Sequence, residues 1–110
     1  LLMAEHGLKD NVALLVVLRP VGQPSQSVVV ANTHVLFNCK RGDVKIGQLR
    51  TTLSKLHELA NSPHLPQPAP CIFAGDMNST PGSALYQFMR EGFIDLGRHD
   101  RREMSGQVEG

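Results

Sequence analysis

One stretch of this sequence has apolar residues at helical spacing, and it stands between shorter stretches that have the pattern of β-strands. Within residues 43–60 the apolar residues follow one another at intervals of 3, 4, 3 and 4, which places a single stripe along a helix: Ile46, Leu49, Leu53, Leu56 and Ala60. Asp43 is expected to cap the start of this helix, and the sequence Asn-Ser-Pro at 61–63 to end it. A helix with one apolar stripe must bury it against another layer, so the pattern predicts an α/β fold.

Three strands are expected around this helix. Residues 11–19 form a nearly continuous apolar run, which is typical of a strand buried on both faces. Residues 27–33 are rich in β-branched side chains, and the short loop at 22–26 predicts an antiparallel hairpin between the two runs. Residues 71–74 predict a short buried strand, which follows an extended, proline-rich surface connection at 63–70.

A second helix is expected after the last strand. Thr80 is expected to be its N-cap, Pro81 suits the first helical position, and Gly92 lies past the predicted end. The expected buried face consists of four apolar residues: Ala84, Leu85, Phe88 and Met89. Residues 93–110 are predicted to be loop.

The chain has 110 residues, with 11 Lys and Arg against 10 Asp and Glu, so it has the size of one small domain and a net charge of only +1. This balance provides no general attraction to nucleic acid. Basic residues are nevertheless concentrated between Lys40 and Glu58, and again between Arg98 and Arg102, where they are expected either to be solvated or to contact phosphates. No apolar run approaches the roughly 20 residues of a membrane span, so no membrane partner is expected.

The sharpest candidate for chemistry is the run Gly-Asp-Met-Asn at 75–78, directly after the strand at 71–74. Gly75 allows a tight turn, and Asp76 and Asn78 point the same way if the extended geometry continues. A carboxylate can hold Mg²⁺ or activate a water, and a carboxamide can orient that water or a phosphate oxygen without adding negative charge. The alternative is an Asx turn that only caps the next helix.

His34, which follows the strand at 27–33, is the second candidate. An imidazole there can donate a hydrogen bond to a phosphoryl oxygen and stabilise charge in a transition state, although a lone histidine at a strand end is commonly structural or solvated. His34 and Asp76 lie 42 residues apart, with one predicted helix between them. Because both close apolar strands, we expect them to come from neighbouring strands of one sheet.

Two longer runs together resemble the endonuclease/exonuclease/phosphatase superfamily and, within it, the carbon catabolite repressor, nocturnin and Angel deadenylase group. They are VVANTHVLFNCKRGDVKIGQLR at 29–50 and IFAGDMNSTPGSALY at 72–86, and HDRREMSGQVE at 99–109 resembles the plant members. The resemblance implies a four-layer α/β sandwich of two mixed β-sheets flanked by helices, of which residues 1–110 are expected to be the middle portion. It also implies magnesium-dependent 3′-to-5′ removal of poly(A) from messenger RNA, with subunits of a deadenylase complex as partners, in the nucleus and cytoplasm.

The resemblance assigns roles to three residues. His34 matches the histidine that contacts the scissile phosphate, Asp76 the aspartate that activates the attacking water at the metal, and Asn78 the asparagine that helps to hold the phosphate. Cys39 stands where the family commonly has a proline that lines the substrate base. The family's metal-binding glutamate belongs to an earlier segment and its closing aspartate–histidine pair to a later one, so these residues alone are expected to be inactive or nearly so.

Two alternatives stay open on the sequence. One is a phosphomonoesterase that acts on a small phosphorylated substrate, because the same kind of metal site serves several phosphate esters. The other is a non-catalytic RNA-binding or scaffold protein that keeps the fold.

Overall fold

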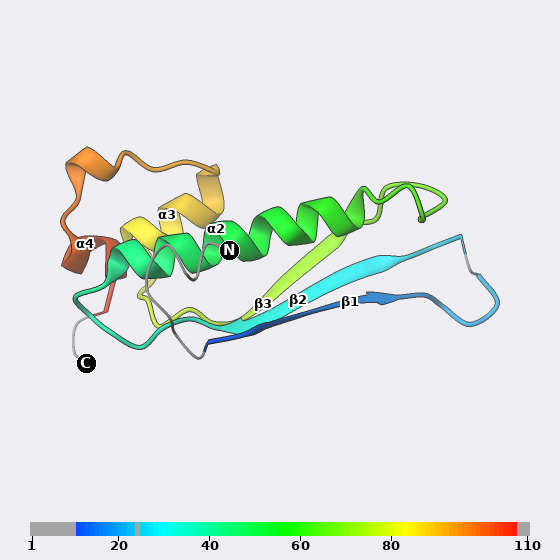
Figure 1. Ribbon diagram of the computed structural model, residues 1–110, viewed down its shortest axis with the longest axis horizontal. Coiled ribbons are helices and arrows are strands. Elements are labelled where there is room, and N and C mark those ends of the chain that lie inside the picture. Colours follow the sequence, from blue (N-terminus) through cyan, green and yellow to red (C-terminus); the bar gives the residue numbers. More distant parts are fainter. Residues whose placement is uncertain (1–10, 24, 108–110) are drawn as a thin grey trace.

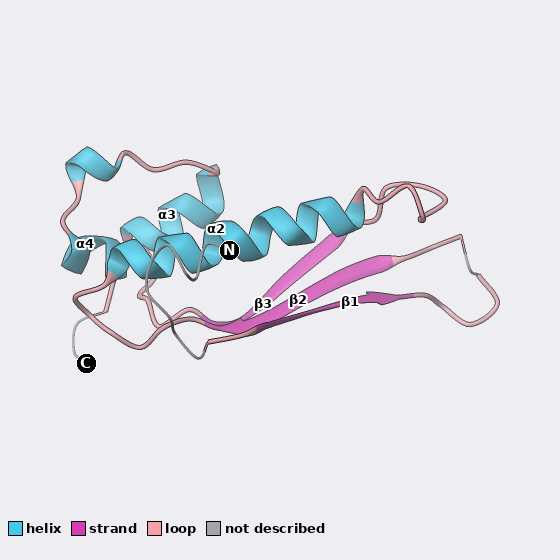
Figure 2. Cartoon of the chain, viewed as in Figure 1, coloured by secondary structure: helices cyan, strands magenta, loops and turns pink. Residues whose placement is uncertain are grey.

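The computed structural model describes residues 11–23 and 25–107, which form a β-sheet with helices against one of its faces (Figure 1). Along the described chain the elements are β1 Ala13–Leu18, β2 Val28–His34, α2 Gly42–Ala60, β3 Cys71–Asp76, α3 Ala84–Glu91, a 3₁₀ turn η1 Leu96–Arg98 and α4 Arg101–Ser105. Figure 2 shows α2 lying along the sheet, with the short helices α3 and α4 near its N-terminal half. This order of strands and helices confirms the predicted α/β class.

The described strands form one sheet in the order β1-β2-β3. β1 and β2 are antiparallel and in register from Ala13 with Thr33 to Leu18 with Val28, which confirms the predicted hairpin. β2 and β3 are parallel, and α2 provides the crossover between them. The parallel pairing of β2 and β3 continues to the last residue of each strand, where His34 is opposite Asp76.

The sheet buries only one of its faces. Side chains alternate between the faces along a strand, and on β2 the residues Val29 and Ala31 are fully buried under Leu56 and Ala60 of α2. The opposite face, which no described element covers, is also apolar: Leu14, Leu18 and Ile72 are each more than half exposed. The predicted burial of 11–19 on both faces, and of the strand at 71–74, is therefore wrong for the described residues, because the helices cover one face alone.

The predicted helix at 43–60 is confirmed as α2, which begins one residue earlier, at Gly42. The expected cap is wrong: Arg41 occupies the N-cap position without a side-chain capping bond, and Asp43 lies in the first turn. The Asp43 carboxylate instead accepts hydrogen bonds from Nε and Nη2 of Arg41, at 3.0 and 3.1 Å. Although α2 has 19 residues, neither it nor any other described helix is long and apolar enough to cross a membrane.

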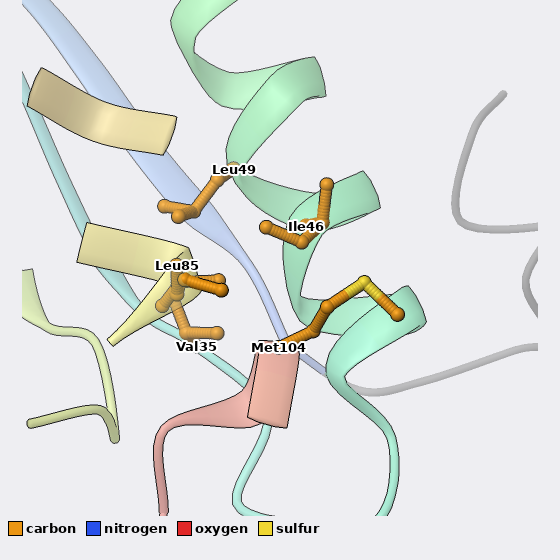
Figure 3. Close-up of a cluster of buried hydrophobic side chains, with 6 residues drawn as sticks. Val35, Ile46, Leu49, Leu85 and Met104 are labelled. Atoms are coloured by element: carbon orange, nitrogen blue, oxygen red, sulfur yellow. The ribbon is translucent and has the colours of Figure 1, made fainter. Parts of the chain in front are cut away.

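A second part of the core lies where α3 and α4 meet α2. Figure 3 shows side chains from these three helices and from the segment after β2 directed toward one another; the buried members are Val35, Ile46, Leu49, Ala84, Leu85 and Met104. Ala84 and Leu85 thus confirm half of the buried face predicted for α3, and Phe88 and Met89 are only partly buried against this cluster. Burial of this kind contributes roughly 1.5–3 kcal/mol for each large apolar side chain.

The start of α3 and the existence of α4 differ from the predictions. α3 begins at Ala84 rather than after Thr80, because Ser83 is extended and its Oγ accepts a bond from the Tyr86 N–H at 3.2 Å. The predicted end is confirmed, since Gly92 caps α3 in the left-handed conformation. Residues 93–110 were predicted to be loop, but within the described part Asp100 caps α4 by accepting from the Glu103 N–H at 2.8 Å.

Gly75 permits the close approach of β3 to β2. Its φ is +145°, and a Cβ built there would overlap the backbone carbonyl of its register partner Thr33.

We expect Gly75→Ala to lower the free energy of unfolding by about 3 kcal/mol, because the strands must separate to admit the methyl group. Urea unfolding of the protein that carries this chain measures the loss.

Gly82→Ala is the matched control, because Gly82 also has a positive φ, of +87°, but a Cβ there would meet no atom within 4 Å. Its expected cost is only that of the left-handed backbone, about 1 kcal/mol. Equal losses in the two variants would contradict the steric explanation.

Candidate active site

The last residues of β2 and β3 form the centre of the candidate site. His34 and Asp76 are paired in register, and both lie on the face of the sheet away from α2. Nε2 of His34 is 3.7 Å from Oδ2 of Asp76, and the two side chains are 69% and 65% exposed. This arrangement confirms the predicted neighbourhood of the two residues. Because 3.7 Å is too long for a hydrogen bond, both side chains can still bind a ligand.

Asn78 is held against the same two strand ends. Its backbone N–H donates to Oδ1 of Asp76 at 2.8 Å, so the Asx turn considered as an alternative is present. Its Nδ2 donates to the carbonyl of Val35, the residue after β2, at 2.7 Å. The turn uses Oδ1 of Asp76 and leaves Oδ2 facing His34. An amide nitrogen has two hydrogens, so the Asn78 carboxamide retains one donor for a phosphate oxygen.

Lys45 is the residue at this site that sequence reasoning missed. It belongs to the basic stretch for which solvent or phosphate contact was expected, yet its side chain is 0% exposed. Its Nζ donates to the backbone carbonyl of Asn78 at 2.7 Å and to Oε1 of Gln107 at 2.6 Å, with a longer contact of 3.4 Å to the Ser105 carbonyl. The expectation of a solvated helix face is therefore wrong for this lysine.

Burial lowers the pKa of Lys45 from 10.5 to about 8, although its electrostatic interactions with Cys39 and Asp76 act in the opposite direction. One sequence pattern could have indicated that Lys45 is buried. Starting from Lys45, residues at intervals of 4, 3 and 4 lie on one side of α2, and these residues are all buried: Leu49, Thr52 and Leu56. A lysine at the head of a buried row is expected to be buried as well.

Several other basic residues of the two basic runs are paired with carboxylates. Arg41 and Arg101 both face Asp43, with the Arg101 Nε 3.8 Å from its Oδ2, and the hydrogen bond from Arg41 lowers the pKa of Asp43. Arg98 pairs with Asp95 at 3.4 Å. These ion pairs reduce the positive charge that the runs present to a polyanion.

The side chains of Phe37 and Tyr86 are both exposed at the surface, at 63% and 42%. Both therefore remain accessible for stacking in the described part of the chain.

The described residues supply one good ligand for the predicted metal. No group of three or more His, Cys, Asp or Glu side chains within the described ranges could hold a metal ion. Oδ2 of Asp76 is an exposed carboxylate oxygen, and Mg²⁺ in proteins is commonly bound by one or two carboxylates together with waters. The donor type of Asp76 therefore fits Mg²⁺.

No protein-family model matches the chain. Curated proteins do: the chain is 42% identical to carbon catabolite repressor protein 4 homolog 5 and 40% identical to homolog 3, both of Arabidopsis thaliana. These alignments cover 96% and 94% of the chain but 25% and 23% of the relatives. Protein angel homolog 2 of Danio rerio is 37% identical over 92% of the chain and 18% of that protein. The chain thus spans about a quarter or less of the length of these relatives.

Solved structures match the fold as well. The crystal structure of ANGEL2, a 2′,3′-cyclic phosphatase, superposes with a TM-score of 0.80 at 37% identity, over 93% of this chain and 28% of that one. Its complex with adenosine-2′,3′-vanadate superposes with a TM-score of 0.81 and covers 29% of that chain. The fold described above is therefore also found as part of a larger, solved protein.

The buried Lys45 predicts an unusual dependence of stability on pH. Between about 8 and 10.5 the unfolded chain keeps a proton on Lys45 that the folded protein has released, so raising the pH through this range favours folding. We expect the free energy of unfolding of the wild type to rise, relative to that of Lys45→Met, over this interval. Urea unfolding at several pH values provides the comparison.

Lys55→Met is the control on the same helix, because the Lys55 side chain is 59% exposed. Its difference from the wild type should stay constant over the same interval, because the side chain of an exposed lysine is solvated in both the folded and the unfolded chain. A difference for Lys45→Met that is equally constant would show that Lys45 is not buried in solution.

Proposed function

This chain belongs to the carbon catabolite repressor 4 and Angel family of the endonuclease/exonuclease/phosphatase superfamily, and from this we infer that its protein hydrolyses phosphodiester bonds. The substrate that we propose is the poly(A) tail of messenger RNA, shortened from its 3′ end with release of adenosine monophosphate. RNA, and the subunits of a deadenylase complex, are the partners that follow from this proposal.

The observation that carries the proposal is the in-register pair of His34 and Asp76, with Asn78 tied to both strand ends. The imidazole and the carboxylate lie side by side on the uncovered face of the sheet, and the carboxamide of the following turn donates to the residue after β2. They are the residue types that phosphodiester hydrolysis requires: an acceptor for the proton of water and neutral or positive donors for the phosphate oxygens.

Asp76, His34 and Asn78 each have a separate role in the proposed hydrolysis. The Asp76 carboxylate accepts a proton from the attacking water, whose oxygen forms the new bond to phosphorus. The bond from phosphorus to the 3′ oxygen of the preceding nucleotide breaks, and this oxygen takes up a proton from solvent to become the new 3′ hydroxyl. His34 and the remaining Asn78 N–H donate to the phosphoryl oxygens as negative charge accumulates on them.

Magnesium is the cofactor that we propose, with Asp76 as its ligand in this chain. When bound, Mg²⁺ would polarise the water and neutralise charge on the phosphate. The remaining ligand that the family resemblance implies is a glutamate from an earlier segment.

The uncovered face of the sheet supports a more specific proposal about the fold of the whole domain. Leu14, Leu18 and Ile72 lie on the same face as His34 and Asp76, and apolar side chains in such a row are expected to pack against another layer. We propose that this layer is the second sheet of a four-layer sandwich, of which residues 1–110 form the middle portion. The candidate site would then lie at the rim between the two sheets.

Hydrolysis of a 2′,3′-cyclic phosphate is the second candidate function, because the matching crystal structures are of a protein described as a 2′,3′-cyclic phosphatase. The same three side chains suit both reactions, since each breaks a bond between phosphorus and a ribose oxygen.

We expect Asp76→Asn to reduce hydrolysis of oligoadenylate by the full protein about 10²- to 10⁴-fold in the presence of Mg²⁺, because an amide cannot accept the proton of water. Asp95→Asn, which changes an exposed carboxylate paired with Arg98, should keep activity within about two-fold of the wild type. Wild-type activity in Asp76→Asn would refute the assignment. A wild-type protein that binds oligoadenylate without cleaving it would favour the non-catalytic scaffold.

Two matched substrates separate the two candidate functions. A poly(A) exonuclease should shorten an oligoadenylate with a free 3′ hydroxyl in single-nucleotide steps, with release of adenosine monophosphate. A cyclic phosphatase should act on the same oligoadenylate ending in a 2′,3′-cyclic phosphate and leave its length unchanged. Separation of the products by length therefore decides between poly(A) removal, which we expect, and end processing.

A further inference from the structure

Lys45 has no part in the chemistry proposed above, although it lies directly beneath the turn that carries Asp76 and Asn78. Its side chain is 0% exposed, and a buried ammonium group is costly unless all its hydrogen-bond donors are satisfied. A methionine of similar length would fill the same space without that cost. Packing alone therefore does not explain a lysine at this position.

The acceptors of the ammonium group join two distant segments. The Asn78 carbonyl, at 2.7 Å, belongs to the turn after β3. The Ser105 carbonyl, at 3.4 Å, ends α4, and Oε1 of Gln107, at 2.6 Å, lies just past it. Since Lys45 itself lies on α2, a single side chain connects three elements. Its three N–H donors match the three acceptors.

The Asn78 turn is a conformation that has to be held. Asn78 has a φ of +46°, in the left-handed region that residues with a Cβ seldom adopt, although Asn enters it more readily than most. Two residues later, the Thr80 N–H donates to the Gly106 carbonyl at 2.8 Å, which ties the same turn to the same end of α4. Lys45 and this backbone bond thus clamp the turn from one side, while Nδ2 of Asn78 ties it to Val35 on the other.

We propose that Lys45 is a positioning residue, which holds the carbonyl of Asn78 and thereby keeps Asp76 and Asn78 in place against His34. The catalytic consequence depends on the function proposed above.

The test compares Lys45→Met with Lys55→Met in the full protein, each assayed on oligoadenylate with Mg²⁺ well below its own melting temperature. Misplacement of the turn should lower kcat about 10- to 100-fold in Lys45→Met, with KM within about three-fold of the wild type. The exposed Lys55→Met should keep both constants. A purely structural lysine would lower the melting temperature and leave the kcat of the folded protein unchanged, which would overturn the proposal.

A double-mutant cycle shows whether Lys45 acts through Asn78. In an Asn78→Ala background, Lys45→Met should cost clearly less in kcat than in the wild type, because the Asn78 carboxamide, one of the two side chains that Lys45 positions, is already gone. The same 10- to 100-fold loss in both backgrounds would contradict action through Asn78. If Lys45→Met fails to fold, Gln107→Ala is the milder variant: it removes the acceptor at 2.6 Å, keeps the lysine, and should lower kcat several-fold. Wild-type kcat in Gln107→Ala would then overturn the proposal.

Hydrogen exchange separates failure of this proposal from failure of the proposed function. The amides of Asn78 and Thr80 should exchange at least about 10-fold faster in Lys45→Met than in Lys55→Met, because the clamp on the turn is released. An inactive wild type would refute the proposed function alone, and these exchange rates would still decide on Lys45. Unchanged exchange at both amides would overturn its positioning role.

Discussion

Parallel pairing of β2 with β3 is the interaction on which the rest of this structure depends. It sets residues that are 42 positions apart directly opposite each other at the ends of two strands, and α2 makes the connection that parallel strands require. Gly75 permits the pairing, since any side chain there would collide with the backbone of Thr33. The ladder continues just past the strand ends, where the Val35 N–H donates to the Asp76 carbonyl at 2.9 Å. His34 and Asp76 are therefore placed by backbone hydrogen bonds rather than by a flexible loop.

One-sided burial then decides which face carries the candidate site. The helices take up the side chains of one face of the sheet, and the alternation of a β-strand sends His34 and Asp76 to the other. That face is apolar along most of its length and polar at the end where the two strands finish. In the four-layer sandwich proposed above, a second layer packed on the apolar part would leave the polar end at its rim, open to the proposed RNA substrate.

A charged group in the core also supports the candidate site. Lys45 is buried at the point where α2, the turn after β3 and the end of α4 converge, and its donors satisfy carbonyl oxygens from the latter two. Gly42 allows α2 and α4 to approach each other closely, because a Cβ there would overlap the backbone of α4 at Arg101 and Ser105. The site consequently rests on contacts between segments that lie 30 to 60 residues apart in the chain.

Local patterns in the sequence were sufficient to predict the helix and strands in which side chains alternate with a regular period. The stripe from Ile46 to Ala60 predicted α2, the β-branched run predicted β2, and strand ends followed by polar residues predicted where His34 and Asp76 would meet. These features are local because helix and strand periods are properties of neighbouring residues. Caps were less predictable, since Arg41 competes for the Asp43 carboxylate and Ser83 displaces Thr80. The short helix α4 has too few residues for a period, and only its Asp-x-x-Glu start marks it.

The sequence by itself therefore determined the α/β pattern and the residue types of the candidate site. Tertiary structure alone decided which face of the sheet is buried, that Asn78 is held by Val35 and Lys45, and that Lys45 is not solvated. The physical reason is that burial and hydrogen-bond satisfaction depend on which distant segments pack together. No short window of sequence contains both partners of those contacts.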